Sequence, residues 1–247
     1  MRKLVIDIGN TRLKAAIFEE KKRSQQAVFA RPSFEGLLEW LENFFPLDGC
    51  IVSNVAAEEP EIMAFLSKNS PVFIELSHKT PLPFSVKYKT PETLGRDRLA
   101  GLAAAQGIFP GKNCLVMDAG TCLKYDLLTA DGAHLGGNIA PGARMRLRAM
   151  HEQTARLPLV EMALPGSEIG DSTQAALQNG GLFGMLLEMR GMVGFLKKKW
   201  PGLEVVVTGG DAEFFYKKLK IKKLRLEKEL VLNGLNAILD FNLTSKV

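Results

Sequence analysis

The chain repeats one short pattern near its start and near its middle, and this repeat most constrains how it can fold. Residues 4–9 read Leu-Val-Ile-Asp-Ile-Gly, and residues 115–120 read Leu-Val-Met-Asp-Ala-Gly. In both copies an apolar strand ends in an aspartate, turns at a glycine and continues into a second apolar strand. With one residue dropped, the copies also pair Thr11 with Thr121 and Leu13-Lys14 with Leu123-Lys124. The repeat indicates duplicated halves of similar topology, and a chance likeness of two hairpins is the alternative.

The first half of the chain alternates between strand-like and helix-like patterns. Apolar runs predict strands over 3–8, 12–18, 49–55 and 71–76, and helical spacing predicts helices over 34–45, 58–69 and 98–109. Residues 77–95 hold three prolines and predict a long loop with one short strand. Long loops in compact domains are often functional.

The second half continues this alternation. Its patterns predict a strand pair over 112–128, a helical region over 172–199, a strand over 203–215 and a helix near 228–241. The basic run 217–225 alternates apolar and charged residues as an exposed strand does, and we assign it no function. We therefore predict an α/β fold of two domains, 1–112 and 113–247.

Charge and cysteine content narrow the classes of function. The 247 residues carry a formal net charge of +5, and 27 acidic residues dilute the basic ones. This balance fits small polyanionic ligands and does not favour nucleic acid as a partner. Cys50, Cys114 and Cys122 lack the spacing of a disulfide framework or a zinc site, which indicates a reducing compartment. We see no signal peptide or membrane span in the sequence, and we expect a cytoplasmic protein.

Each glycine turn of the repeat can bind phosphate. A tip of Gly9-Asn10-Thr11 or Gly120-Thr121 presents consecutive backbone N–H groups and a hydroxyl to phosphate oxygens. Asp7 and Asp118, at the strand ends, need a cation between themselves and phosphate, normally Mg²⁺. Two such turns facing one another would clamp the triphosphate of a nucleotide. The signatures of P-loop, Rossmann and protein-kinase sites do not occur in the sequence.

Five elements, taken in order, resemble those of the type III pantothenate kinases, which have an actin-like ATPase fold. They are Asp7-Ile8-Gly9-Asn10-Thr11, Tyr88 with Pro91 and Gly95-Arg96-Asp97-Arg98, Asp118-Ala119-Gly120-Thr121, Gly136-Gly137-Asn138-Ile139 with Pro141-Gly142, and Thr208-Gly209-Gly210. The resemblance implies two duplicated ribonuclease H-like domains with a nucleotide cleft between them. It also implies that ATP phosphorylates pantothenate to 4'-phosphopantothenate, the first step of coenzyme A biosynthesis.

The resemblance further implies a role for each matching residue. Asp7 would hold Mg²⁺, Asp118 a monovalent cation (potassium or ammonium), and Asp97 would accept the proton of the attacking hydroxyl. The residues that contact ATP would be Asp7, Ile8, Gly9, Asn10, Thr11, Arg12, Leu13, Lys14, Thr121, Gly209 and Gly210, the last two against adenosine. Those that contact pantothenate would be Tyr88, Gly95, Arg96, Asp97, Arg98 and Thr173, with Ser172 as the alternative to Thr173. The family is dimeric, and the apolar helices over 172–199 could form the interface or belong to the core.

Simpler roles exist for several of these residues. Asp97 also fits the N-cap of the helix after it, Arg98 a surface ion pair, and Tyr88 a packing role in its loop. Pro141-Gly142 also fits an ordinary turn. Cys122 stands where the family commonly has alanine, and its small side chain should fit. We expect structural or surface roles for His78, His134 and His151, which have no ligand-spaced carboxylate or cysteine.

Two other functions stay open. One is a kinase of the same fold that acts on a sugar or acetate. The other is a nucleotide-binding regulatory protein, because relatives of this family were first named as accessory transcription factors. That function would need a DNA-binding surface, and the sequence has no helix-turn-helix signature or basic stripe.

Overall fold

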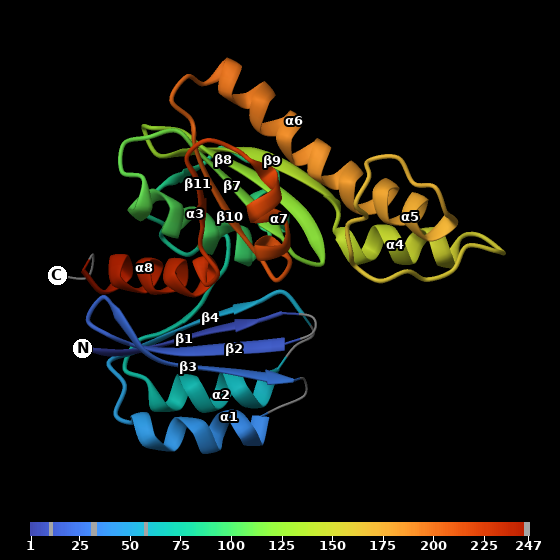
Figure 1. The fold of residues 1–247 in the computed structure, drawn as a ribbon. Helices are drawn as coiled ribbons and strands as arrows, with labels where there is room; N and C mark the ends of the chain where they lie inside the picture. Colours follow the sequence, from blue (N-terminus) through green and yellow to red (C-terminus); the bar gives the residue numbers. More distant parts are fainter. Residues whose placement is uncertain (10–11, 31–33, 57–58, 245–247) are drawn as a thin grey trace. The chain divides into compact units, whose positions relative to one another are not determined.

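The computed structural model describes residues 1–9, 12–30, 34–56 and 59–244. Contacts divide the chain into two compact units. The first comprises Met1–Ile108, Gly132–His134 and the C-terminal residues from Leu230, and the second comprises Phe109–Asp131 and Leu135–Glu229. Each unit contains a β-sheet with helices packed on it (Figure 1). No helix among the described residues is long and apolar enough to cross a membrane.

The first unit is built on a five-stranded sheet in the order β3-β2-β1-β4-β5. The strands are β1 (Arg2–Ile8), β2 (Arg12–Glu19), β3 (Lys22–Ala30), β4 (Gly49–Asn54) and β5 (Phe73–Glu75). β2 pairs antiparallel with β1 and β3, whereas β4 runs parallel to β1 and β5. The sequence did not predict β3, because its exposed polar residues form no apolar run at this edge of the sheet.

Helices cover both faces of this sheet. On one face, α1 (Phe34–Leu41) and α2 (Pro60–Asn69) pack against alternate residues of β1, namely Leu4, Ile6 and Ile8. The residues between them, Val5 and Asp7, belong to the opposite face because side chains alternate along a strand. The C-terminal helix α8 (Leu230–Thr244) contacts β1 and β4, and α3 (Arg96–Ile108) packs on α8.

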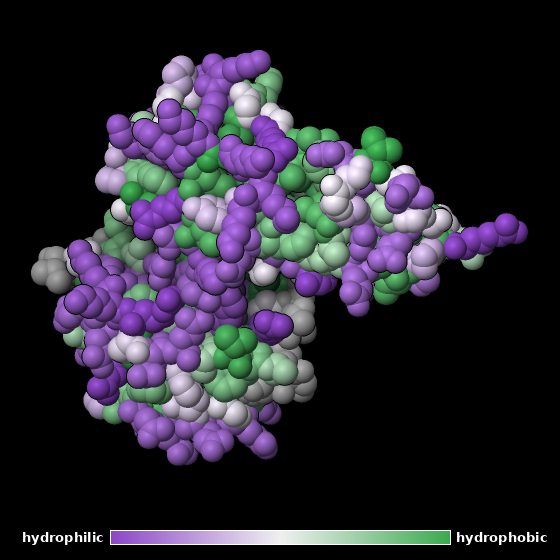
Figure 2. All heavy atoms as spheres, in the orientation of Figure 1, coloured by the Kyte–Doolittle hydropathy of each residue, from purple (hydrophilic) through white to green (hydrophobic). Residues whose placement is uncertain are grey.

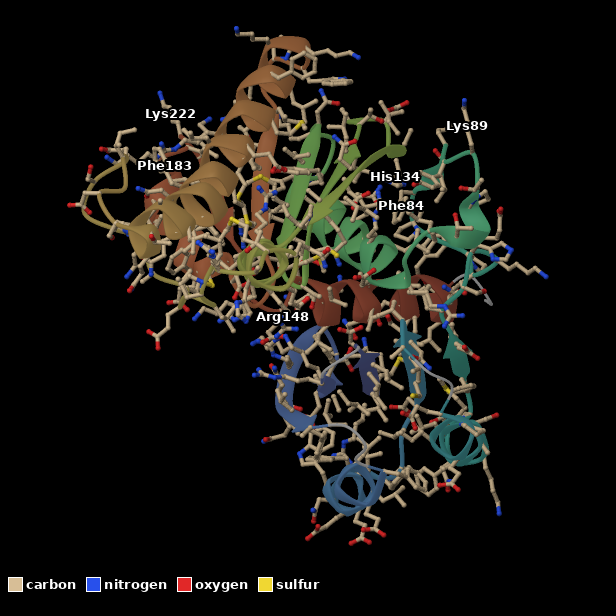
Figure 3. The ribbon with its side chains drawn as sticks, turned by 90° about the vertical axis from the view of Figure 1, so that its right-hand side faces the viewer. Phe84, Lys89, His134, Arg148, Phe183 and Lys222 are labelled. Atoms are coloured by element: carbon tan, nitrogen blue, oxygen red, sulfur yellow. The ribbon has the colours of Figure 1, made fainter. Side chains whose placement is uncertain are left out.

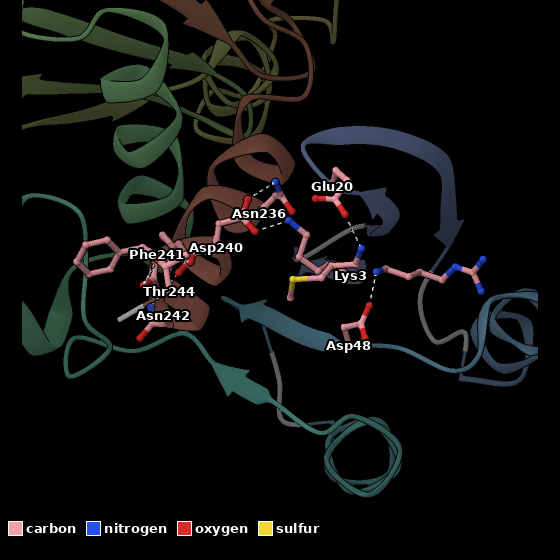
Figure 4. Close-up of polar contacts among 11 residues, drawn as sticks. Lys3, Glu20, Asp48, Asn236, Asp240, Phe241, Asn242 and Thr244 are labelled. Atoms are coloured by element: carbon pink, nitrogen blue, oxygen red, sulfur yellow. Dashed lines mark hydrogen bonds and ion pairs between the residues drawn. The ribbon is translucent and has the colours of Figure 1, made fainter. Parts of the chain in front are cut away.

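Polar contacts and a close backbone approach fix α8 in the first unit. The buried Lys3 of β1 forms an ion pair with Asp240, and Asn236 Nδ2 donates to Asp240 Oδ2 at 3.2 Å (Figure 4). A Cβ atom on Gly234 would lie 1.7 Å from the carbonyl oxygen of Ala100, so α3 and α8 meet backbone to backbone. The last helix of the chain therefore completes the unit that its first strand begins.

The second sheet has the order β11-β10-β7-β8-β9-β6. Its strands are β6 (Ser85–Val86), β7 (Cys114–Ala119), β8 (Cys122–Leu128), β9 (Ala133–Pro141), β10 (Glu204–Thr208) and β11 (Leu224–Leu226). β7 pairs antiparallel with β8 and parallel with β10. The two residues of β6 pair with Ala133 and His134, and contacts place all four in the first unit.

The helices of the second unit pack on its sheet through one apolar core. They are α4 (Ala143–Glu152), α5 (Thr173–Gln178), a π-helical turn (Asn179–Phe183), α6 (Gly184–Lys199) and α7 (Ala212–Leu219). The core joins Met117, Leu123 and Val207 of the strands to Met185 and Phe215 of the helices. Hydrophilic side chains cover most of the face drawn in Figure 2.

Two predictions about the second unit were wrong. The strand predicted over 203–215 ends at Thr208, because the chain turns at Gly209 and continues as α7 from Ala212. Little of the segment 217–225, which was predicted as an exposed strand, is a strand. Residues 217–219 form the end of α7, and only residues 224–225 belong to a strand, β11, which pairs with β10. The apolar residues Phe215 and Leu219, four positions apart, pack into the core and give this segment helical spacing.

Candidate functional site

The two copies of the repeat have the same register in the structure. Asp7 lies opposite Lys14 across the β1–β2 hairpin, and Asp118 lies opposite Lys124 across β7–β8. One position further on, Ile8 faces Leu13 and Ala119 faces Leu123. The alignment made with one residue dropped is therefore confirmed: each unit places a lysine across from the aspartate that ends its first strand.

Backbone hydrogen bonds close both glycine turns. Gly9 N donates to the Arg12 carbonyl oxygen at 3.0 Å, and Gly120 N donates to that of Cys122 at 3.1 Å. Asn10 and Thr11, which the sequence assigns to ATP, lie outside the described residues. Of the other residues assigned to ATP in this hairpin, Ile8 and Leu13 are buried in the core, so only their backbone is available to a ligand.

Glycines pack closely around the second turn. A Cβ atom on Gly209, whose φ is +101°, would lie 2.4 Å from both Asp118 Oδ1 and the Ala119 carbonyl oxygen. A Cβ atom on Gly142 would lie 2.3 Å from the Gly120 carbonyl oxygen. Only glycine fits at either position. Gly142 is therefore required for the close packing of the chain on the second turn, and not only as an ordinary turn residue. The structure thus brings the Thr208-Gly209-Gly210 turn against Asp118, as a shared site would require.

Two helices begin beside this second turn. Gly142 N, just before α4, donates to the Thr121 carbonyl oxygen at 3.2 Å. Asp211 N, just before α7, donates to the Ala119 carbonyl oxygen at 2.9 Å. The amino end of a helix carries partial positive charge and unpaired N–H groups. The surroundings of the turn therefore suit an anion.

Charge around Asp118 is already partly balanced. Lys124 Nζ lies 2.7 Å from Asp118 Oδ2, and the two side chains are 16% and 21% exposed. The Lys124 ammonium group is a cation beside the turn. The other carboxylate oxygen of Asp118, Oδ1, lies on the side of Gly209. Among the described residues, no group of three His, Cys, Asp or Glu side chains could hold a metal ion. Mg²⁺ commonly takes one or two protein carboxylates and otherwise water and phosphate oxygens, so the single carboxylate of Asp7 fits a Mg²⁺ ion bound together with phosphate.

Four of the residues assigned to the acceptor, Gly95 to Arg98, lie at the start of α3. This helix begins at Arg96, so Asp97 is in its first turn and is not the N-cap that its sequence also allowed. The Gly95 carbonyl oxygen accepts from Arg98 N at 3.1 Å and Leu99 N at 3.3 Å. Asp97 Oδ1 accepts from Arg98 N at 2.9 Å, and a Cβ atom on Gly95 would lie 2.6 Å from Oδ1. Glycine at 95 therefore leaves room for this carboxylate.

Arg96 connects this turn to the edge of the first sheet. Its Nη1 donates to the Asn54 carbonyl oxygen at 2.5 Å and lies 3.4 Å from Glu75 Oε1. Asn54 is the last residue of β4 and lies opposite Ile8, the residue after Asp7. Within the first unit, the turn that carries Asp97 and the end of β1, where Asp7 is the next-to-last residue, therefore share the carboxyl edge of one sheet.

Tyr88 and Arg98 form a stack with a residue to which we gave no function. The Arg98 guanidinium carbon lies 5.5 Å from the centre of the Tyr88 ring, and the His134 ring lies parallel to Tyr88 at 6.1 Å. Arg98 and His134 are buried, which contradicts a surface ion pair for Arg98. In Figure 3, His134 lies beside Phe84, at the base of the loop whose Lys89 points outward. His134 gave no sequence signal, because its contacts come from a β6–β9 pairing and not from local spacing.

Thr173 begins α5 in the second unit and is exposed. The neighbouring Ser172 is the N-cap of α5, and its Oγ accepts from Ala175 N at 3.3 Å. A serine used as a cap has its hydroxyl oxygen engaged within the chain. Of the two candidates, Thr173 is therefore the one whose side chain does not form the cap.

Comparisons with known proteins show the family to which the sequence is similar. The profile of the type III pantothenate kinase family matches residues 3–194. A protein of that name from Phocaeicola vulgatus is 42% identical over 239 residues, with 97% of this chain and 98% of the relative covered. Another from Christiangramia forsetii is 39% identical over 242 residues, with 98% and 99% covered.

Solved structures show the same fold. A Campylobacter jejuni protein named as a candidate Baf family transcriptional activator has a TM-score of 0.64 at 22% identity, with 98% of this chain and 99% of that chain covered. A glucokinase from an Antarctic psychrotroph has a TM-score of 0.55 at 12% identity, with 97% and 99% covered. At these identities the likeness concerns the fold alone. The predicted fold class, an α/β fold of the actin-like ATPase type, is confirmed.

Proposed function

The chain belongs to the type III pantothenate kinase family, and we propose which steps its two glycine turns and the start of α3 carry out in the phosphorylation of pantothenate. In this reaction a phosphoryl group is transferred from ATP to pantothenate, which is the first step of coenzyme A biosynthesis. One observation best supports the assignment of ATP binding to the two turns: both units place an aspartate and a lysine opposite one another beside a glycine turn. Each turn thus has a carboxylate for a cation and an ammonium group that can attract phosphate.

ATP is bound by both turns in this proposal. Residues 7–14 line the phosphates of ATP and Thr121 contacts ATP as well, while Gly209 and Gly210 lie against adenosine. The exposed Arg12 and half-buried Lys14 add positive charge to the first turn. Asp7 is the carboxylate that holds Mg²⁺, which neutralises phosphate charge when bound. Asp118, beside Lys124, takes a potassium or ammonium ion.

Pantothenate lies at the start of α3 in this proposal. Asp97 orients the primary hydroxyl and accepts its proton as the phosphoryl group transfers. Phosphoryl transfer has a loose transition state, so alignment of the hydroxyl matters more than the basicity of the carboxylate. Gly95 and Arg96 shape this turn, Arg98 and Tyr88 contact the substrate, and Thr173 contributes from α5. The first turn of α3 supports this role, since the Arg96 side chain holds the turn to Asn54 and Arg98 N donates to the Asp97 carboxylate.

Release of ADP from ATP tests the proposal. Purified protein with Mg²⁺ and potassium should release ADP when pantothenate is added, and little ADP with glucose or acetate instead. Replacing potassium by sodium should slow the reaction, because the smaller ion fits a site for potassium or ammonium poorly. An equal rate of ADP release in potassium and in sodium would contradict the role proposed for Asp118. No ADP release with pantothenate under any cation would contradict the proposal as a whole.

The stack behind Tyr88 leads to a prediction about pantothenate binding. His134→Ala should raise the KM for pantothenate roughly three- to tenfold, because Tyr88 loses the ring that holds it beneath Arg98. His134→Phe retains a planar ring and should stay within about twofold of the unchanged protein. The KM for ATP should not change in either variant. Steady-state kinetics with each substrate varied would measure both constants, and an equal rise of both would contradict the idea.

We also propose a homodimer formed through the second unit. Five large apolar side chains of this unit are exposed on β9, α4 and α6, namely Leu135, Ile139, Met145, Leu187 and Phe195. Leu187 and Phe195 are eight positions apart, which places them on one face of α6. A second copy of the chain would bury these side chains. The mass of the protein in solution distinguishes a dimer from a monomer.

The cysteines support a cytoplasmic location, which is also a proposal. Cys50, Cys114 and Cys122 are free thiols. Burial raises the pKa of Cys114 to about 12, and it also raises the pKa of Cys50, so both thiols remain neutral and unreactive. Free thiols are typical of a reducing compartment.

A further inference from the structure

We propose that Ser53 is a positioning residue for Asp7: its hydroxyl donates to the Asp7 carboxylate when Mg²⁺ and ATP are bound. Nothing in the sequence marked Ser53, and its role rests on the one proposed for Asp7. Ser53 is fully buried, and its Oγ has no hydrogen-bond partner among the described residues. Buried polar groups in proteins nearly always have a partner, so such a hydroxyl needs an explanation.

The register of the sheet places Ser53 beside Asp7. β4 runs parallel to β1, and Ser53 lies directly opposite Asp7. Residues opposite one another on neighbouring strands project to the same face of the sheet. That face is the one covered by α8, since Leu4, Ile6 and Ile8 project into the core on the other side. The hydroxyl and the carboxylate are therefore nearest neighbours at the carboxyl edge of the sheet.

The second unit repeats this arrangement. Thr208 of β10 lies opposite Asp118 of β7, as Ser53 lies opposite Asp7, and Thr208 is also buried. Each aspartate thus has a lysine on its antiparallel neighbour and a hydroxyl residue on its parallel neighbour. A hydroxyl that recurs at the equivalent position of both units points to a shared task next to the carboxylate. Holding one carboxylate oxygen leaves the other oriented toward a cation.

A binding experiment tests this role without relying on turnover. Ser53→Ala should weaken the affinity for ATP with Mg²⁺ roughly three- to tenfold in calorimetry, the usual net effect of one hydrogen bond. The affinity for ATP in the presence of a chelator should stay unchanged. The midpoint of thermal unfolding should be the same or higher, because the substitution removes a buried hydroxyl that has no partner in the free protein.

Two comparison variants separate the explanations. Ser70→Ala alters another buried serine of the first unit, which follows α2 away from this edge, and should leave the affinity unchanged. Asp7→Asn should weaken the affinity for ATP with Mg²⁺ more strongly than Ser53→Ala. If Asp7→Asn weakens it and Ser53→Ala does not, the role of Ser53 is wrong and that of Asp7 stands. If neither does, the proposed role of Asp7 fails as well. A lower unfolding midpoint for Ser53→Ala would show a structural role instead.

Discussion

Asp97→Asn lowers the turnover of pantothenate phosphorylation by roughly 10²-fold or more, the usual contribution of a positioned general base. Asparagine has nearly the same shape, but its neutral amide cannot accept the proton of the attacking hydroxyl. The substitution should spare the fold, because an amide oxygen can still accept from Arg98 N in the first turn of α3. Steady-state kinetics would show the loss in kcat.

Two measurements accompany this result. The dissociation constant of ATP should change by less than about twofold, because Asp97 contacts the acceptor and not the nucleotide in our proposal. Asp131→Asn makes the same chemical change at an exposed turn after β8 and should leave turnover unchanged. Asp97→Asn with normal turnover would show that another group accepts the proton or that none is needed.

Gly234→Ala lowers the midpoint of thermal unfolding by roughly 6–12 °C, which corresponds to about 3 kcal/mol for a chain of this size. The added Cβ atom would lie 1.7 Å from the Ala100 carbonyl oxygen, a distance that no side-chain rotation can relieve because both partners are backbone. The helices α3 and α8 must then move apart. Since α3 also carries Asp97, activity should fall together with stability.

Gly107→Ala is the matched control for this change. Gly107 lies in α3, the helix that Gly234 of α8 contacts, and a Cβ atom there meets no atom outside its own stretch of helix within 4 Å. Alanine favours a helix more than glycine does, so the free energy of unfolding should stay the same or rise by up to about 1 kcal/mol. The unfolding midpoint should accordingly stay the same or rise. Calorimetry of both variants measures the difference. Equal midpoints for the two variants would mean that the close approach of α3 and α8 does not limit stability.

Local sequence determined the elements that contain the repeat. The hairpins β1–β2 and β7–β8 each follow from apolar strands joined at a short glycine turn. Once a hairpin forms, its turn sets the register, so the pairing of aspartate with lysine could be predicted from residues close in the chain. The buried strand β4 was predictable for a similar reason, because a continuous apolar run needs no distant information.

Tertiary structure alone decided the features that depend on distant partners. β3 is a strand because β2 offers it an edge, although its own residues are polar. His134 stacks on Tyr88 because β6 pairs with β9, and Ser53 lies beside Asp7 because β4 runs parallel to β1. The helix α8 joins the first unit because Gly234 permits close contact with α3. Apart from β3, whose partner β2 is its neighbour in the chain, the deciding interaction in each case links segments far apart in the chain, and local periodicity carries no record of it.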